Sequence, residues 1–322
     1  MDLNYERATR KHLEEAVNLA AGAYREERQA LPILPDAEDF LSVIRESLEE
    51  VLEEGSGVFA LSGGRLAGFL VGFPVETLFG KARGIYVPVY GQGTLKENRR
   101  GIYRGLYREA AALWVAEERL THAVTLYAHD GEALDTWFWL GFGLRCVDAL
   151  REVRPLQAPG LRDIALKKTT LEDLPALAGI LDEHYRYFLN SPIFMPHPDK
   201  NPLEEFRNWL QKDNHHAWAA CGDGKLLGYM RVQPAAESFV STHKRTMNIT
   251  GAHVLEGKRK AGIGTMLLEE TQRWLATEGY TLCGVDFESF NTPGSSFWNK
   301  YFTPYTYSLV RRIDERVLPP GR

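Results

Sequence analysis

The chain has 322 residues, of which 44% are hydrophobic and 25% are charged, as in a folded globular protein with one large or two ordinary domains. A net charge of -5 and a pI near 6.0 argue against nucleic acid as the main partner. No apolar run approaches the roughly 18 residues that cross a membrane, and the charged N-terminus lacks the apolar core of a secretion signal. We therefore expect a cytoplasmic protein that binds neither nucleic acid nor membrane.

Bound metal is not expected either. Cys146, Cys221 and Cys283 are widely spaced and include no CxxC pair, which argues against a disulfide framework and against a zinc site. His215 and His216 are adjacent, so their side chains diverge, and no third ligand is evident beside them.

The first half of the chain has the pattern of a mixed α/β unit. Thr9 is a suitable N-cap for an amphipathic helix from Leu13, and Asp36 opens a second helix that runs to Val51. Residues 57–74 predict two strands around a Gly63-Gly64 turn. The elements expected after them are a strand at 85–90, a helix after Arg100, a strand at 124–128 and a helix at 134–140.

The second half repeats this order after the Pro- and Gly-containing segment 155–160. Pairs of residues about 160 positions apart fall in corresponding elements: Thr9 and Thr170, Leu13 and Leu174, Gly64 and Gly224, Gly68 and Gly228, Pro74 and Pro234, Arg100 and Arg259, Trp137 and Trp298. Two long copies indicate a duplicated unit rather than a solenoid. We expect an N-terminal domain at 1–154, a linker at 155–163 and a C-terminal domain at 164–322.

A glycine-rich turn in the second copy is the most informative stretch. A strand ending at Val254 leads to GKRKAGIG at 257–264 and then to a helix with Met266, Leu267 and Leu268 at helical spacing. Such a turn directs backbone N–H groups toward an anion at the start of the helix. A turn that only connects strand and helix would have the same composition, so the neighbouring motifs decide between these interpretations.

Two motifs give the chain a family resemblance. Arg259, Gly262 and Gly264 form Arg-x-x-Gly-x-Gly after the strand, and about thirty residues later Asn291 opens an Asn-x-x-Gly block that ends at Trp298. With the repeat, these motifs resemble the GCN5-related N-acetyltransferase (GNAT) superfamily in tandem, although the family has tyrosine where this chain has Trp298. The resemblance implies an α/β fold of two GNAT-like domains, each a mixed, mostly antiparallel sheet flanked by helices.

The resemblance implies acetyl-CoA as co-substrate. The start of a helix binds the pyrophosphate of coenzyme A through N–H groups, with glycines allowing close approach and Arg259 adding charge-assisted hydrogen bonds. The residues that the resemblance assigns to the cofactor are Val254, Arg259, Lys260, Ala261, Gly262, Ile263, Gly264, Thr265, Asn291 and Trp298.

The first copy departs from the motif. In the aligned segment from Arg100 to Gly105, Tyr103 stands where the first key glycine belongs, and we expect its ring to crowd the phosphate position. Asp130 replaces the asparagine and places a negative charge where an anionic ligand would bind. We therefore expect the first copy not to bind the cofactor in the family's usual way.

The family's reaction is direct attack of an amine on the thioester, which needs a base and gains from an acid. The resemblance implies that a backbone N–H near Val254 polarises the carbonyl. Glu288 is the candidate base and Tyr301 the candidate acid, since the indole N–H of Trp298 is a donor but not a usable acid. A surface position for Glu288 and a packing role for Tyr301 remain open alternatives.

The segment 184–197 occupies the place where the family builds its acceptor pocket. Tyr185, Tyr187, Phe188 and Phe194 are its candidate lining residues, or they plug the adjacent core. The leading hypothesis is an N-acetyltransferase for a small-molecule amine, acting as a monomer or homodimer. A non-catalytic acyl-CoA-binding protein, favoured by Trp298, and a protein or peptide N-acetyltransferase are the alternatives.

Overall fold

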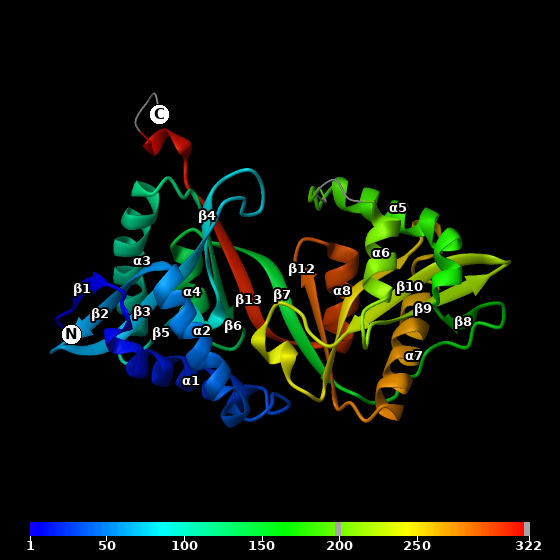
Figure 1. Ribbon diagram of the computed structural model, residues 1–322, viewed down its shortest axis with the longest axis horizontal. Coiled ribbons are helices and arrows are strands. Elements are labelled where there is room, and N and C mark those ends of the chain that lie inside the picture. Colours follow the sequence, from blue (N-terminus) through cyan, green and yellow to red (C-terminus); the bar gives the residue numbers. More distant parts are fainter. Residues whose placement is uncertain (197–200, 319–322) are drawn as a thin grey trace. The chain divides into compact units, whose positions relative to one another are not determined.

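The computed structural model describes residues 1–196 and 201–318 and divides them into two compact units. The first unit comprises Met1–Val147 together with the segment from Pro304 onward, and the second comprises Asp148–Thr303. The mixed α/β fold expected from the sequence is confirmed, with the same order of elements in each unit (Figure 1). None of the described helices is long and apolar enough to cross a membrane.

The elements of the first unit are β1 (Asn4–Arg7), α1 (Leu13–Ala30), α2 (Leu41–Glu54), β2 (Ser56–Ser62), β3 (Arg65–Val75), β4 (Gly84–Val87), β5 (Gln92–Thr94), α3 (Arg99–Ala116), β6 (Thr121–Tyr127), α4 (Gly131–Trp139) and β13 (Thr303–Arg312). Those of the second are β7 (Gly143–Glu152), which enters it from the first, β8 (Ala165–Lys168), α5 (Leu174–Leu189), α6 (Pro202–Leu210), β9 (His216–Gly222), β10 (Lys225–Gln233), β11 (Thr246–Val254), α7 (Ile263–Thr277), β12 (Leu282–Glu288) and α8 (Thr292–Tyr301).

The strand order is β1-β2-β3-β4-β6-β13 in the first unit and β7-β12-β11-β10-β9-β8 in the second. The first sheet contains the parallel pair β4 and β6, and the second contains the parallel pair β11 and β12. Both parallel pairs extend over four positions, which agrees with the duplication seen in the sequence.

The last strand returns to the first unit. β13 pairs antiparallel with β6, from Thr306 opposite Tyr127 to Arg312 opposite Thr121, and it carries Leu309 into the core of that unit. The expected boundaries at 154 and 164 therefore differ from the division of the chain, and the segment 155–163 lies within the second unit. The physical reason is that β6, buried at every position, has β4 on one side only and needs a partner on the other.

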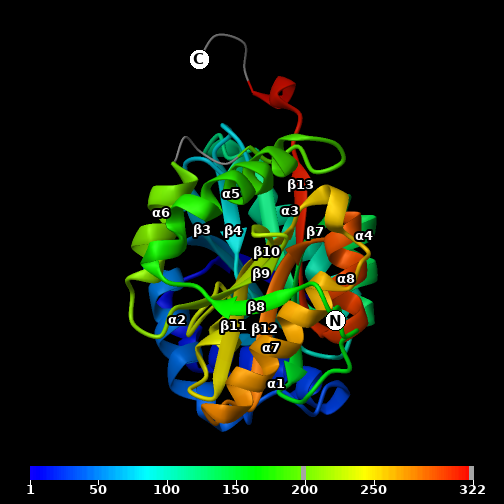
Figure 2. The ribbon, with the colours of Figure 1, turned by 90° about the vertical axis from the view of Figure 1, so that its right-hand side faces the viewer.

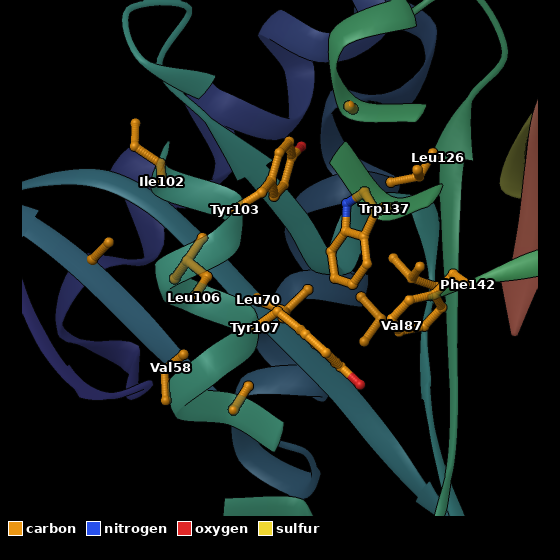
Figure 3. Packing of buried hydrophobic residues seen from close by; sticks show 14 of the residues in the cluster. Val58, Leu70, Val87, Ile102, Tyr103, Leu106, Tyr107, Leu126, Trp137 and Phe142 are labelled. Atoms are coloured by element: carbon orange, nitrogen blue, oxygen red, sulfur yellow. The ribbon is translucent and has the colours of Figure 1, made fainter. Parts of the chain in front are cut away.

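Side-chain alternation gives the first unit two packed faces. Val58 and Ala60 of β2 face α3 and share a core with Leu106 and Trp137. Figure 3 shows Val58, Leu106 and Trp137 in this core. Phe59, between them, points to the other face, where its ring meets His12 edge-to-face just before α1 at 5.7 Å.

The second unit is layered in the same way, with α5 and α6 on one face of β9 and β10 and α7 on the other (Figures 1 and 2). Tyr229 of β10 joins the core formed by α5 and α6, which includes Leu177 and Phe206. On the opposite face Trp218 of β9 packs against Trp274 of α7 with ring centroids 5.2 Å apart. This packing fixes α7 so that its first residue, Ile263, follows closely after Val254, the last residue of β11.

A truncation tests the return of the last strand. A chain ending at Phe302 loses β13, so the β6 edge and the site of Leu309 become exposed; we expect its first unit to unfold at least about 10 °C lower than in the intact chain. A chain ending at Ile313 keeps β13 and serves as the control. Thermal unfolding followed by circular dichroism gives the comparison, and equal midpoints for the two truncations would contradict the assignment of β13 to the first unit.

Candidate functional site

The two central strands of the second unit diverge and open a cavity. The parallel register of β11 and β12 runs from Thr246 opposite Leu282 to Ile249 opposite Val285, and a bulge in β11 follows at Thr250. Beyond this point residues 250–254 and 286–288 line opposite sides of a cavity of about 1320 Å³. Because β12 has moved away, backbone groups on that side of β11 are available to a ligand, and the expected polarising N–H near Val254 belongs to this stretch.

The glycine-rich turn lies at one end of this cavity. Gly262 has φ +91° and is the N-cap of α7, and Lys260 also adopts a left-handed conformation with φ +63°. The first helical bond is Met266 N–H to the Gly262 carbonyl at 3.0 Å, so the N–H groups of Ile263, Gly264 and Thr265 precede the intrahelical bonding. The helix start has the geometry that the sequence predicts, and such a start is suited to binding an anion.

Three cations surround the turn. Lys258, Arg259 and Lys260 line the cavity, and none of them forms an ion pair with a carboxylate of residues 1–196 or 201–318. Arg259 is held by its Nε, which donates to the Val254 carbonyl at 3.0 Å. The guanidinium is therefore held at the cavity wall without an ion pair, so its remaining N–H groups can donate to a phosphate.

The aligned arginines of the first unit are neutralised. Arg99 is buried between Asp130, at 2.8 Å, and Glu26, at 3.1 Å, and Arg100 pairs with Asp135. The helix α3 already begins at Arg99, so the segment that corresponds to the turn is helical and its N–H groups become bonded within the helix, starting with Ile102 to the Asn98 carbonyl. The first unit lacks the turn.

The expected position of Tyr103 is wrong. Its ring does not project into a phosphate site but is buried in the core, 5.8 Å from the ring of Trp137 (Figure 3), and its hydroxyl donates to Gln92. Asp130 is engaged within the first unit. It caps α4 by accepting a hydrogen bond from Ala133 N–H at 3.0 Å, and it pairs with Arg99. The helical register of α3 turns the tyrosine inward.

The segment 155–160 also reaches the turn. Pro159 packs so closely on Gly262 that a β-carbon there would lie 2.3 Å from the proline Cγ, and Ala158 N–H donates to Glu269 of α7 at 3.3 Å. Gln157 and Pro159 line the cavity. Glycine is therefore required at 262 both by its backbone angle and by this contact.

The Asn291 motif also lines the cavity. The Asn291 amide oxygen caps α8 by accepting from Gly294 N–H at 3.3 Å, and it also accepts from the Tyr187 hydroxyl at 2.8 Å. Trp298 lines the cavity but is only 8% exposed and packs against Phe297 and Phe302. Tyr301 also lines the cavity, and its hydroxyl lies 3.0 Å from the hydroxyl of Thr265 at the start of α7.

Two carboxylates of β12 face the cavity. Glu288, the base expected from the sequence, is joined there by Asp286, because residues two apart on a strand point to the same side. Burial, followed by the negative charges of Asp148, Glu237 and Glu288, raises the pKa of the Asp286 carboxyl to about 8. Sequence reasoning missed Asp286; the Asp-x-Glu spacing was the available signal, whereas its shifted pKa depends on neighbours distant in sequence.

Three of the four residues predicted to line the pocket for the acceptor substrate lie at the cavity. Tyr185, Tyr187 and Phe188 of α5 line the cavity as expected, and the Tyr185 hydroxyl donates to Glu205 of α6. Phe194 does not, because it is 68% exposed, and its assignment to the pocket is wrong. Ala261 is likewise exposed and not among the lining residues, and His197 lies outside the described residues.

A pair of stacked imidazoles adjoins these aromatics. His184 and His253 lie with ring centroids 4.7 Å apart, and both line the cavity. His253 Nε2 is 3.1 Å from Glu183, and His184 Nδ1 is 2.7 Å from the Tyr229 hydroxyl. Burial lowers the pKa of His253, so its ring is neutral near pH 7. No group of three or more His, Cys, Asp or Glu side chains in the described ranges is arranged to hold a metal ion.

Comparisons with known proteins give a family match for part of the chain and a likeness in fold for nearly all of it. A model described as "Acetyltransferase (GNAT) family" matches residues 178–302, whereas comparison with curated proteins gives no match. A tandem GNAT protein from the clavulanic acid biosynthesis pathway is 16% identical, with 97% of this chain and 98% of that one covered and a TM-score of 0.50.

A GCN5-related N-acetyltransferase from Sphaerobacter thermophilus is 14% identical, with 96% of this chain and 95% of that one covered and a TM-score of 0.61. At these identities the structural likeness establishes the fold alone. The family match itself covers residues 178–302, in the second half of the chain, and the likeness in fold to these two solved structures extends over nearly the whole chain.

Proposed function

We propose that the second unit is an N-acetyltransferase that uses acetyl-CoA to acetylate the amine of a small molecule. The observation that carries the proposal is the charge of the turn: Lys258, Arg259 and Lys260 stand beside the start of α7 and form no ion pair with a carboxylate of the described residues, whereas the aligned Arg99 and Arg100 are paired. An anionic ligand with a pyrophosphate satisfies both the charges and the N–H groups.

Other side chains that line the cavity supply acid–base chemistry. Attack of a neutral amine on the thioester forms a C–N bond and breaks the C–S bond, and one amine proton must leave. Asp286, with a pKa of about 8, is suited to accept that proton near neutral pH. The thiolate takes up a proton, for which Tyr301 is our candidate because its hydroxyl lies in the cavity beside Thr265.

A small acceptor fits the aromatic side of the cavity. Tyr185, Phe188 and Phe206 contribute rings there, and Glu205 contributes a carboxylate that can attract an ammonium group. Such a pocket between α5 and α6 favours a compact amine over an extended peptide.

A second candidate, a binding protein without turnover, is favoured by the packed Trp298 in place of the family's tyrosine. Release of free thiol from acetyl-CoA in the presence of an amine panel separates the two candidates. Binding of acetyl-CoA without thiol release from any amine would favour the binding protein.

Removal of one charge tests the cofactor site. We expect Arg259→Ala to weaken coenzyme A binding about 10- to 100-fold, because charge-assisted hydrogen bonds to a phosphate are lost. Arg100→Ala, at the aligned position of the first unit, is the control and should leave the affinity unchanged. Isothermal titration calorimetry measures both, and an equal effect of the two substitutions would refute the assignment. Arg259 is a cleaner target than Gly262, whose substitution would also displace Pro159.

The pH dependence tests the base. Since Asp286 must be ionised to accept a proton, kcat/KM is expected to rise with pH up to about 8 and then level off. Asp286→Asn should lower kcat/KM by roughly 100-fold or more and remove this rise. Glu288→Gln removes a negative charge that raises the pKa of Asp286, so the rise should move to lower pH in that variant. A profile that is the same in Glu288→Gln and wild type would argue against Asp286 as the titrating group.

A further inference from the structure

Tyr187 connects the two cofactor motifs. Its ring lies under the guanidinium of Arg259, with the Arg259 Cζ 4.3 Å from the ring centroid, and its hydroxyl donates to the Asn291 amide oxygen at 2.8 Å. Arg259 follows β11 and Asn291 follows β12, so one side chain of α5 spans the gap between the diverging strands.

The ring and the hydroxyl act on different partners. The ring attracts the guanidinium from one side while the Val254 carbonyl accepts from Arg259 Nε, and these contacts orient the remaining N–H groups of Arg259. Because Arg259 forms no ion pair with a carboxylate of the described residues, the ring of Tyr187 is the main side-chain contact that holds its guanidinium in place.

The Tyr187 hydroxyl donates to the Asn291 amide oxygen, which a ligand in the cavity could otherwise use as a hydrogen-bond acceptor. An amide oxygen has two lone pairs, and those of Asn291 are taken by Gly294 N–H and by Tyr187. The first of these bonds caps α8 and is part of the fold. A ligand that lies between the ends of β11 and β12 and donates to Asn291 must therefore displace the tyrosine hydroxyl, while the aromatic ring can stay beside Arg259.

We propose that Tyr187 is a positioning residue whose two parts have opposite effects on coenzyme A binding. Its ring strengthens binding by holding Arg259 ready for phosphate, and its hydroxyl weakens binding by closing the cleft through Asn291. This inference rests on the proposed function of the cavity. It adds that the hydrogen bond from the Tyr187 hydroxyl to Asn291, here called the latch, breaks when the ligand binds.

Two substitutions separate the two effects. Tyr187→Phe keeps the ring and removes the latch, so it should bind coenzyme A about three- to tenfold more tightly than wild type. Tyr187→Leu removes both the ring and the latch, so it should bind coenzyme A more weakly than Tyr187→Phe by about tenfold. Isothermal titration calorimetry measures both affinities, and thermal unfolding verifies that both variants are folded.

Pantetheine, which lacks the pyrophosphate, provides the readout that a purely structural role would not produce. The Tyr187→Phe and Tyr187→Leu variants should both bind pantetheine more tightly than wild type does. Both lack the latch, and Arg259 has no phosphate of pantetheine to contact. In an Arg259→Ala background the two substitutions should likewise become equivalent toward coenzyme A.

Each outcome decides the inference. Coenzyme A affinity that is unchanged or lower in Tyr187→Phe overturns the latch. If Tyr187→Leu binds more weakly than Tyr187→Phe by the same factor for pantetheine as for coenzyme A, the role of the ring in positioning Arg259 is overturned. A wild-type protein that binds neither coenzyme A nor acetyl-CoA overturns the proposed function itself, and with it the inference; wild-type binding without the predicted ordering of variants overturns the inference alone.

Discussion

The divergence of two parallel strands is the constraint on which the site depends. In the second unit β11 and β12 separate after Ile249 and Val285, and the space between them is left to a cavity. In the first unit the parallel pair β4–β6 also ends after four positions, but Gln92 of β5 donates to the carbonyls of Val89 and Thr125 and accepts from Tyr103. The same strand geometry is thus filled by a buried polar side chain in one copy and left open in the other.

Charge pairing follows the same division. Arg99 is buried and would carry an uncompensated charge without Asp130 and Glu26, so the carboxylates are part of the stability of the first unit. Arg259 is only half-buried, contacts the cavity and is held by an aromatic ring and a carbonyl instead of a carboxylate. Arg99, which is paired with two carboxylates, contributes to the packing of the first unit. Arg259, which forms no ion pair with a described carboxylate, remains available to bind an anion.

Local features were accessible from sequence, and features that depend on distant neighbours were not. The hairpins and the turn at Gly262 follow from glycine conformation and hydrophobic periodicity, which involve residues close in the chain. The repeat was visible because the same local patterns occur twice, about 160 residues apart. The burial of Tyr103 depends on where α3 begins, and the raised pKa of Asp286 depends on carboxylates as far away as Asp148. The exposure of Phe194 and the return of β13 are likewise set by tertiary packing, on which composition and motif spacing carry no information.

The return of β13 links the two halves during biosynthesis. Most of the first unit is synthesised before the second, yet its sheet lacks the neighbour of β6 until Arg312 has been synthesised. Domains usually fold in the order of synthesis, but here the nascent first half must wait with an unpaired strand edge while the whole second half is translated. A gene cut at the segment 155–163 would therefore yield two fragments, of which the first is missing a strand that only the second encodes.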